Sequence, residues 1–331
     1  MARFMLPRSH DRPVTDCDPR HVAGPVLRRN ADLRRARQVL DGFRRKVAQP
    51  MENQRASLVS TLAQDSPGRR PAARSAVVSS SILGVAVACV DMAGMIDELG
   101  RWLNRREIDD EGIYICFRDV HGIVLAQDDA ELMEAHHRAH LVVADGKPLS
   151  VLGRARGNRG MEQVRGVDSV PALCSAGLGK GWRHFFIGGA PGVADQLAQA
   201  MTRRYPGLVV VGTECPPFRP LSVEETDAVV ARINSARADF VWVGLGSPKQ
   251  ELWMARVAPR LKGAICMGVG AAFDVHTERV RRAPEWVRRA GVEWAFRITQ
   301  EPRRLTGRYL RAIPRFLALI ALEALGRRTG A

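Results

Sequence analysis

The chain lacks the long apolar runs that would let it cross a membrane repeatedly. Its longest apolar stretches, residues 82–90 and 316–322, fall far short of the ~20 residues of a membrane-spanning helix. The six cysteines stand singly, without a CxxC pair or a Cys/His ligand spacing. We expect buried or incidental thiols in a reducing compartment, and exclude a multi-pass membrane protein, a disulfide framework and a zinc framework.

Aromatic residues are also scarce, at 6%, but apolar residues as a whole are not. Of the 331 residues, 46% are hydrophobic and 26% are charged. This balance is typical of a chain that buries a core, which excludes a wholly disordered or low-complexity protein. The length is sufficient for one large domain or two ordinary ones.

Acidic residues are too few to balance the basic ones, and the net charge is +15. Residues 1–80 carry 16 basic and 7 acidic side chains, residues 279–331 carry 13 and 4, and residues 81–278 carry 21 and 24. The basic excess therefore belongs to the two ends, and neither end interleaves it with aromatics as nucleic-acid surfaces do. We expect no nucleic-acid partner, but an anionic lipid or a phosphorylated substrate.

Three regions of the chain differ in pattern. Residues 1–80 combine arginine clusters with Pro, Ser and Ala, and are predicted to be a disordered basic extension. Residues 81–278 alternate short apolar runs with helical patterns, which is typical of a mostly parallel sheet with crossover helices. Residues 279–331 lose the strands and are predicted to form an arginine-rich helical appendage. The expected fold class is α/β.

Strands and helices alternate through the central region. The strands are expected at 82–88, 113–117, 140–143, 183–188, 208–212, 239–245 and 263–269. The helices are expected at 92–105, 129–138, 147–156, 168–178, 190–204, 222–236 and 248–260. Near-continuous apolar strands such as 239–245 indicate burial on both faces of the sheet.

The appendage contains an amphipathic pattern within residues 303–325. Apolar residues recur there at roughly helical spacing, with arginines among them. Such a helix can lie in a membrane interface, although Pro314 is expected to kink or divide it. The alternative is a terminal helix that docks on the sheet or on another subunit.

A glycine-rich turn follows the predicted strand 183–188. Gly188, Gly189 and Gly192 lead into the helix 190–204, and glycines there let backbone N–H groups approach a phosphate at a helix N-terminus. The turn is not GxGxxG, and no acidic residue follows at the spacing of a ribose-binding site. A nucleotide site and a plain tight turn both remain open.

A second turn follows the strand 239–245. Gly244, Gly246 and Ser247 precede a helix whose first turn carries Lys249 and Gln250. Since open parallel sheets bind ligands at the carboxyl ends of their strands, Lys249 and Gln250 are candidate ligand-binding residues. The alternative is a capped strand-to-helix turn with solvated charges.

Two further strand ends carry titratable side chains. Asp145 follows the strand 140–143 and is a candidate general base, although an aspartate before a glycine is also common turn chemistry. Asp119 and His121 follow the strand 113–117. His121 is a candidate base or substrate hydrogen-bonding group, whereas a lone histidine is more often structural.

Taken together, the motifs form an ordered series across about residues 82–315. They are Leu83-Gly84-Val85, Asp145-Gly146, Gly166-x-Asp168, Gly188-Gly189-Ala-Pro-Gly192, Tyr205-Pro206-Gly207, Gly244-Leu-Gly-Ser-Pro-Lys-Gln-Glu251, Gly268-Val-Gly-Ala-Ala-Phe-Asp274, Arg282-Ala-Pro284, Glu293-Trp294 and Glu301-Pro-Arg-Arg304. With this series the sequence resembles the WecG/TagA/CpsF glycosyltransferases, glycosyltransferase family 26.

The resemblance implies an inverting enzyme that uses no metal or cofactor. It would move a sugar from a UDP-sugar to a polyprenyl-diphosphate-linked saccharide in bacterial cell-surface or exopolysaccharide synthesis. The implied fold is a Rossmann-like core of the glycosyltransferase E type, with a C-terminal appendage that meets the membrane and helps to complete the active site. The implied location is cytoplasmic, peripheral on the inner face of the plasma membrane, and a homo-oligomer is left open.

Roles for individual residues follow from the resemblance. Asp145 matches the position proposed as the family's catalytic base, and would take a proton from the acceptor hydroxyl. The two glycine turns, with Lys249 and Gln250, would hold the UDP. The arginines expected to neutralise the leaving diphosphate are Arg297, Arg303, Arg304 and Arg308.

Several positions depart from the family pattern. Phe117-Arg118-Asp119 stands where the family usually has Thr-x-Asn near the acceptor pocket, and Gln163 stands where it has an arginine. The string Gly270-Ala-Ala-Phe-Asp274 replaces Gly-Gly-Ala-Phe-Asp, and Glu278 occupies a usual glycine. Phe117 and Asp119 bear on the sugar and the acceptor rather than on the chemistry. The string Arg118-Asp-Val-His-Gly122 resembles a subgroup of the family, which suggests a variant specificity.

Two other functions compete with this interpretation. A nucleotide-binding Rossmann-like oxidoreductase requires a GxGxxG turn and a ribose carboxylate, and the sequence has neither. A basic protein that binds nucleic acid or an anionic surface requires its charge on the folded core, and residues 81–278 are slightly acidic.

Overall fold

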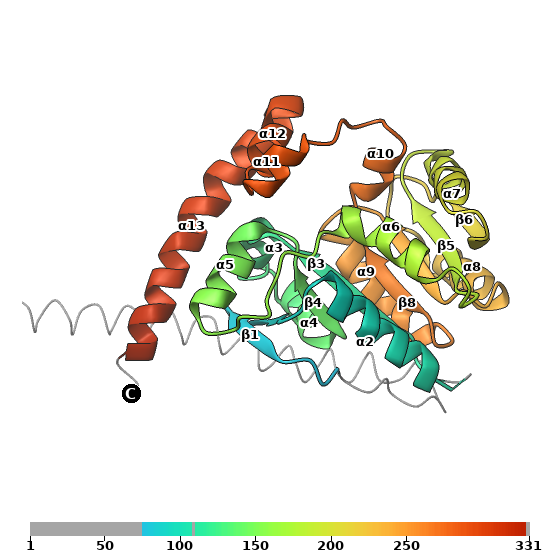
Figure 1. The fold of residues 1–331 in the computed structure, drawn as a ribbon, viewed down its shortest axis with the longest axis horizontal. Helices are drawn as coiled ribbons and strands as arrows, with labels where there is room; N and C mark the ends of the chain where they lie inside the picture. Colours follow the sequence, from blue (N-terminus) through green and yellow to red (C-terminus); the bar gives the residue numbers. More distant parts are fainter. Residues whose placement is uncertain (1–74, 108–109, 329–331) are drawn as a thin grey trace, which may run out of the picture. The chain divides into compact units, whose positions relative to one another are not determined.

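The computed structural model describes residues 75–107 and 110–328 (Figure 1). Most of the predicted disordered extension, residues 1–74, lies outside the described residues. The described chain forms an eight-stranded sheet with helices on both faces, and the predicted α/β, Rossmann-like fold is confirmed. The division of the chain at residues 80 and 278 stays a prediction.

The sheet has the order β1-β2-β4-β3-β8-β7-β5-β6. Its strands are β1 (Ser79–Ile82), β2 (Val85–Ala88), β3 (Ile113–Arg118), β4 (Leu141–Ala144), β5 (Arg183–Gly188), β6 (Val209–Glu214), β7 (Phe240–Gly244) and β8 (Ile265–Gly268). β1 pairs antiparallel with β2, and every other neighbouring pair is parallel. Residues 240–243 of β7 are all buried, as expected for a strand covered on both faces.

The strand predicted at 82–88 is wrong as a single element. The chain reverses at Leu83 and Gly84, whose φ angles are 50° and 83°, and forms the β1–β2 hairpin. Two consecutive residues at positive φ make a tight turn that fits the twist of paired strands. The other six predicted strands are confirmed within two residues at each end.

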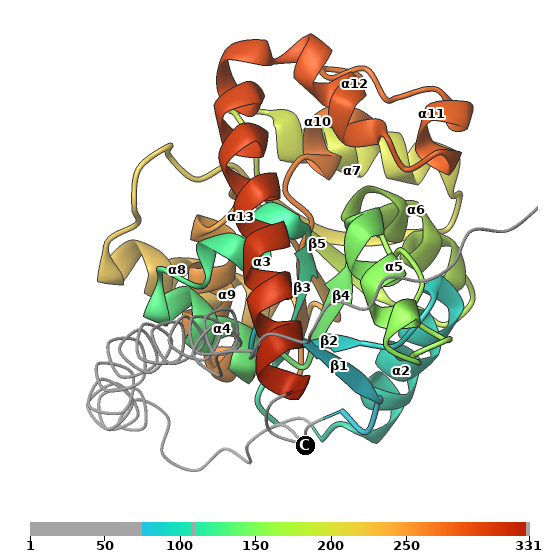
Figure 2. The ribbon, with the colours of Figure 1, turned by 90° about the vertical axis from the view of Figure 1, so that its left-hand side faces the viewer.

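The helices that connect the strands also follow the prediction. They are α2 (Met92–Arg105), α4 (Ala130–Arg138), α5 (Lys147–Ala155), α6 (Gly166–Ala176), α7 (Val193–Arg204), α8 (Val223–Ser235) and α9 (Lys249–Val257). Figure 2 shows α4, α8 and α9 on one side of the sheet and α2 and α6 on the other. Two short helices, α3 (Val120–Leu125) and α10 (Ala272–His276), were not predicted.

The appendage is helical, as predicted, and consists of α11 (Glu285–Arg289), α12 (Glu293–Gln300) and α13 (Pro302–Arg328). α13 lies along α3 and buries Leu305, Ala312 and Phe316 (Figure 2). Among the helices of residues 75–107 and 110–328, none combines the length and apolar character needed to cross a bilayer.

Pro314 does not divide this helix, so the expected division is wrong, while the expected kink stays a prediction. α13 continues through Pro314 to Arg328. Proline leaves the carbonyl four residues earlier without its helical hydrogen bond. Here that residue is Leu310, which is 69% exposed. Water can therefore satisfy the carbonyl, while the inner face of the helix keeps its packing.

Candidate active site

The candidate residues of the core gather at one edge of the sheet, where the parallel strands end. Asp119 follows β3, Asp145 follows β4, and the two glycine turns follow β5 and β7. The order β4-β3-β8-β7-β5 places these strand ends in one row. Open parallel sheets bind their ligands at this edge.

The two glycine turns meet where the chain changes direction within the sheet. From β5 the chain crosses outward to β6, whereas from β7 it crosses back to β8, so α7 and α9 cover opposite faces. We call this place the switch point. The Gly189 N–H donates to the Gly244 carbonyl over 3.1 Å, and a Cβ on Gly188 would lie 2.5 Å from the Gly244 carbonyl carbon. Only glycine at 188 permits this approach.

Two helix N-termini begin at the switch point without side-chain caps. Gly192, at a φ of 82°, is the N-cap of α7, and Pro248 is the N-cap of α9. A Cβ on Gly192 or Gly246 would meet nothing within 4 Å, so the space beside both turns is open. Uncapped N–H groups at a helix N-terminus stabilise anions such as phosphate.

Lys249 and Gln250 point in different directions. Lys249 is exposed, and its Nζ lies 5.2 Å from the centre of the Phe218 ring. Gln250 is 3% exposed, and its Nε2 donates to the Gly268 carbonyl and to Glu251 Oε1, each over 2.8 Å. The Gln250 amide thus faces the protein interior, and its contact with a nucleotide stays a prediction.

Asp145 is partly buried just beyond β4. Its Oδ1 accepts a hydrogen bond from the Gly166 N–H over 3.2 Å, and Gln163 donates to its carbonyl over 2.7 Å. Burial, together with the negative charge of Asp119, raises the pKa of Asp145 to about 6. A carboxylate with this pKa is ionised at neutral pH and more basic than an ordinary aspartate, which suits a general base.

Asp119 is the N-cap of α3 and also holds the appendage. Its Oδ1 accepts from the Gly122 N–H over 2.8 Å, and its Oδ2 accepts from Arg308 Nη2 over 3.1 Å. Burial acts to raise the pKa of Asp119, but Arg308 and the Gly122 hydrogen bond outweigh it and hold the pKa below its ordinary value. Asp119 is therefore charged, which suits an anchor for Arg308 better than a second base.

His121 lies on α3, in the turn that follows Asp119. Its Nδ1 is buried, and no hydrogen-bond partner reaches it in the described part of the chain. Burial and the positive charge of Arg308 hold the pKa of His121 below its ordinary value. The imidazole is thus neutral at pH 7, and a neutral imidazole can donate or accept a hydrogen bond with a substrate.

The arginines of the appendage differ in their surroundings. Arg308 pairs with Asp119, as described above. Arg297, on α12, is partly buried, and its charge acts to lower the pKa of Asp145, although burial and the charge of Asp119 outweigh it. Arg303 is exposed on α13. The Arg304 side chain lies outside the described residues. Binding of a diphosphate by these arginines stays a prediction.

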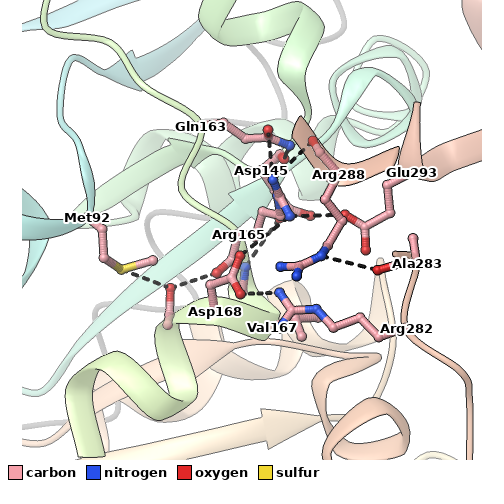
Figure 3. Close-up of polar contacts among 12 residues, drawn as sticks. Met92, Asp145, Gln163, Arg165, Val167, Asp168, Arg282, Ala283, Arg288 and Glu293 are labelled. Carbon is pink, nitrogen blue, oxygen red and sulfur yellow. Dashed lines mark hydrogen bonds and ion pairs between the residues drawn. The ribbon is translucent and has the colours of Figure 1, made fainter. Parts of the chain in front are cut away.

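One arginine beside Asp145 was missed by the sequence analysis. Arg165 lies between Asp168 and Glu293, with Nη1 at 3.6 and 3.3 Å from their carboxylates (Figure 3). Arg282 forms an ion pair with the same Asp168. Arg165 directly precedes the Gly166-x-Asp168 motif, and Asp168 is a local partner, but its other partner, Glu293, lies on α12 of the distant appendage. No local pattern predicts that second contact.

The described residues offer no cluster of metal ligands. Within residues 75–107 and 110–328, no three His, Cys, Asp or Glu side chains are grouped so that they could hold a metal ion. The metal-independent chemistry that the family resemblance implies stays a prediction.

Comparison with known families identifies the chain. Residues 80–330, which contain the sheet except for Ser79 of β1, together with α13 and every site residue named above, match the model described as the glycosyl transferase WecG/TagA/CpsF family. Transfer of a sugar from a nucleotide-sugar donor to an acceptor, in the synthesis of cell-surface polysaccharide, agrees with the Asp145 carboxylate and the switch point on one sheet edge. The chain belongs to the WecG/TagA/CpsF family of glycosyltransferases.

Proposed function

We propose that the protein is an inverting, metal-independent glycosyltransferase that moves a sugar from a UDP-sugar to a polyprenyl-diphosphate-linked saccharide. The observation that carries this proposal is the placement of a basic carboxylate and two uncapped helix N-termini on the same edge of the sheet. A displacement at a sugar carbon needs both: a base for the incoming hydroxyl and a site for the departing diphosphate.

The two carboxylate oxygens of Asp145 differ in their hydrogen bonding. Oδ1 accepts the Gly166 N–H, whereas no donor among the described residues reaches Oδ2. Oδ2 therefore takes the proton of the acceptor hydroxyl as that oxygen attacks C1 of the donor sugar. The C1–O bond breaks with its electron pair moving to UDP, and attack from the opposite side inverts C1.

The spacing of the strands supports this arrangement. β4 and β7 are separated by β3 and β8. With neighbouring strands about 4.8 Å apart, the strand ends that carry Asp145 and Gly244 lie roughly 14 Å apart. A nucleoside near the switch point thus leaves room for a diphosphate and a sugar directed toward Asp145. Lys249 and Arg297 supply positive charge along this path.

The outer face of α13 supports contact with a membrane. Leu310, Leu317, Leu322 and Leu325 are 69%, 62%, 43% and 57% exposed, and Trp286 of α11 is 72% exposed. Exposed apolar residues on an arginine-rich helix are typical of helices that lie in the lipid interface. We place the protein on the inner face of the plasma membrane, where a lipid-linked acceptor is available; a homo-oligomer stays a prediction.

The pH dependence of transfer should follow the ionisation of the Asp145 carboxyl group. The base acts only when ionised, and its pKa is about 6, so kcat/KM should rise with pH up to about 6 and then level off. Asp119→Asn removes the neighbouring negative charge that helps to raise this pKa, so the acidic limb should move to lower pH. A pH–rate profile with an unmoved limb in Asp119→Asn would exclude Asp145 as the titrating group.

The donor site should depend on Lys249 and Phe218. Phe218 is 97% exposed, beside Lys249. An aromatic ring stacked on a base is worth about 1–3 kcal/mol, so Phe218→Ala should weaken UDP binding by that amount. Lys249→Ala should weaken it by about 1–3 kcal/mol through loss of a charge-assisted hydrogen bond. Calorimetry should show both losses, and unchanged affinity in Val223→Ala, a matched exposed apolar residue.

Thermal unfolding with different ligands tests the proposed function against its alternatives. A ligand that binds only the native state raises the melting temperature. UDP should raise it, whereas NAD and single-stranded DNA should not. Stabilisation by NAD alone would favour an oxidoreductase, and stabilisation by DNA alone would favour a nucleic-acid binding protein.

A further inference from the structure

Arg118, the last residue of β3, forms a buried ion pair that the mechanism above does not use. Arg118 is 2% exposed, and its partner Glu251 is 0% exposed. Removing two charges from water costs about as much as their attraction returns, so a buried ion pair contributes little net stability. The best-attested use of such pairs is to fix the relative positions of the segments that carry them. The contacts of Arg118 show which segments it holds in place.

Arg118 connects the two halves of the candidate site. Its carbonyl accepts the N–H groups of Asp145 and Gly146 over 2.8 and 3.2 Å. Its Nη1 donates to Ser247 Oγ over 3.2 Å, in the turn after β7. Glu251, the ion-pair partner of Arg118, is held in place as well, because Gln250 donates both to Glu251 and to the Gly268 carbonyl. One residue thus holds the base segment through its backbone and the donor turn through its side chain.

The contact with Arg118 decides which way the Ser247 hydroxyl can act. Ser247 Oγ accepts from Arg118, so the single hydroxyl proton is left to donate elsewhere. The Ser247 side chain is exposed, and no described residue offers it an acceptor. Arg118 remains charged despite burial: desolvation lowers its pKa, but Glu251 and other nearby acidic groups outweigh this and raise the pKa.

We propose that Arg118 is a positioning residue that directs the Ser247 hydroxyl onto the diphosphate of the nucleotide-sugar donor; this rests on the donor site of the proposed function. The buried guanidinium polarises Ser247, and the hydroxyl donates a hydrogen bond to a phosphate oxygen. As the C1–O bond breaks, negative charge grows on that diphosphate and the hydrogen bond strengthens. No proton is transferred at Ser247, because the proton of the acceptor goes to Asp145.

A double-mutant cycle with two ligands tests this role. Ser247→Ala, at an exposed position, should weaken UDP binding roughly tenfold. Arg118→Gln/Glu251→Gln replaces the ion pair by a shorter, uncharged amide pair and should weaken UDP binding roughly three- to tenfold, since charge assistance about doubles a hydrogen bond. In the Ser247→Ala background the amide pair should change UDP affinity less than twofold. Uridine, which lacks phosphate, should bind all four proteins alike.

The other outcomes of this experiment distinguish failure of the proposed Arg118 role from failure of the proposed donor site. If the amide pair weakens UDP equally with and without Ser247, or weakens UDP and uridine alike, the Arg118 role is overturned and the donor site stands. If the wild-type protein does not bind UDP, the donor site itself fails. Should thermal unfolding show that the amide pair does not fold, the same cycle is run with Arg118→Lys, whose single ammonium cannot hold both partners as the guanidinium fork does; the same expectations apply.

Discussion

Asp145→Asn should lower turnover by roughly 10²–10⁴-fold while UDP affinity stays unchanged. Asparagine has the size of aspartate and its side-chain oxygen can still accept the Gly166 N–H, but it cannot take a proton from the acceptor hydroxyl. Steady-state kinetics and calorimetry on the same preparation separate the two effects.

The control for this substitution is Asp227→Asn, which removes an exposed carboxylate of α8 that pairs with Arg260, away from the candidate site. It should leave turnover within twofold of the wild type. Near-normal turnover in Asp145→Asn would refute the assignment of the base. A larger loss in Asp119→Asn than in Asp145→Asn would move the base to Asp119.

Removal of residues 302–331 should abolish transfer even to a water-soluble acceptor analogue. The deletion removes Arg308 from Asp119 and uncovers α3, which α13 packs against. Two further ion pairs, Arg315–Asp128 and Arg156–Glu323, are lost with it. Transfer to the soluble analogue is measured so that loss of membrane contact alone cannot explain the result.

A triple substitution on the outer face of the same helix provides the matched control. Leu310→Gln, Leu317→Gln and Leu325→Gln change exposed side chains and leave the buried Leu305, Ala312 and Phe316 in place. This variant should lose vesicle binding and keep soluble-acceptor turnover. Full soluble-acceptor activity in the deletion would mean that α13 acts only as a membrane anchor, and the proposed role of Arg303, Arg304 and Arg308 in transfer would be wrong.

Most of the fold could be predicted from the sequence because a parallel sheet leaves a local signal. Its strands are short apolar runs, and its helices are amphipathic and bounded by caps such as the Ser222–Glu225 capping box of α8. The signal failed at residues 82–88, where the turn at Leu83 and Gly84 is hidden inside an apolar run. It failed again at α3, whose six residues give too few periods to detect.

The location of the candidate site was also predictable, but its contacts were not. The rule that ligands bind at strand ends needs only the order of elements. Arg308–Asp119 and Arg118–Glu251 join residues 189 and 133 positions apart, and no local pattern specifies such pairs. The inward direction of Gln250 likewise depends on β8, which supplies the Gly268 carbonyl.

The measurement that tests the account most directly is product analysis with a panel of UDP-sugars and a short-chain polyprenyl-diphosphate-linked saccharide, in the presence of a chelator. Mass spectrometry should show an acceptor heavier by one sugar with one donor of the panel, and nuclear magnetic resonance should show that C1 of this sugar is inverted. Asp145→Asn should give little of this product. A product with retained configuration, or transfer that stops when divalent metal is removed, would contradict the account.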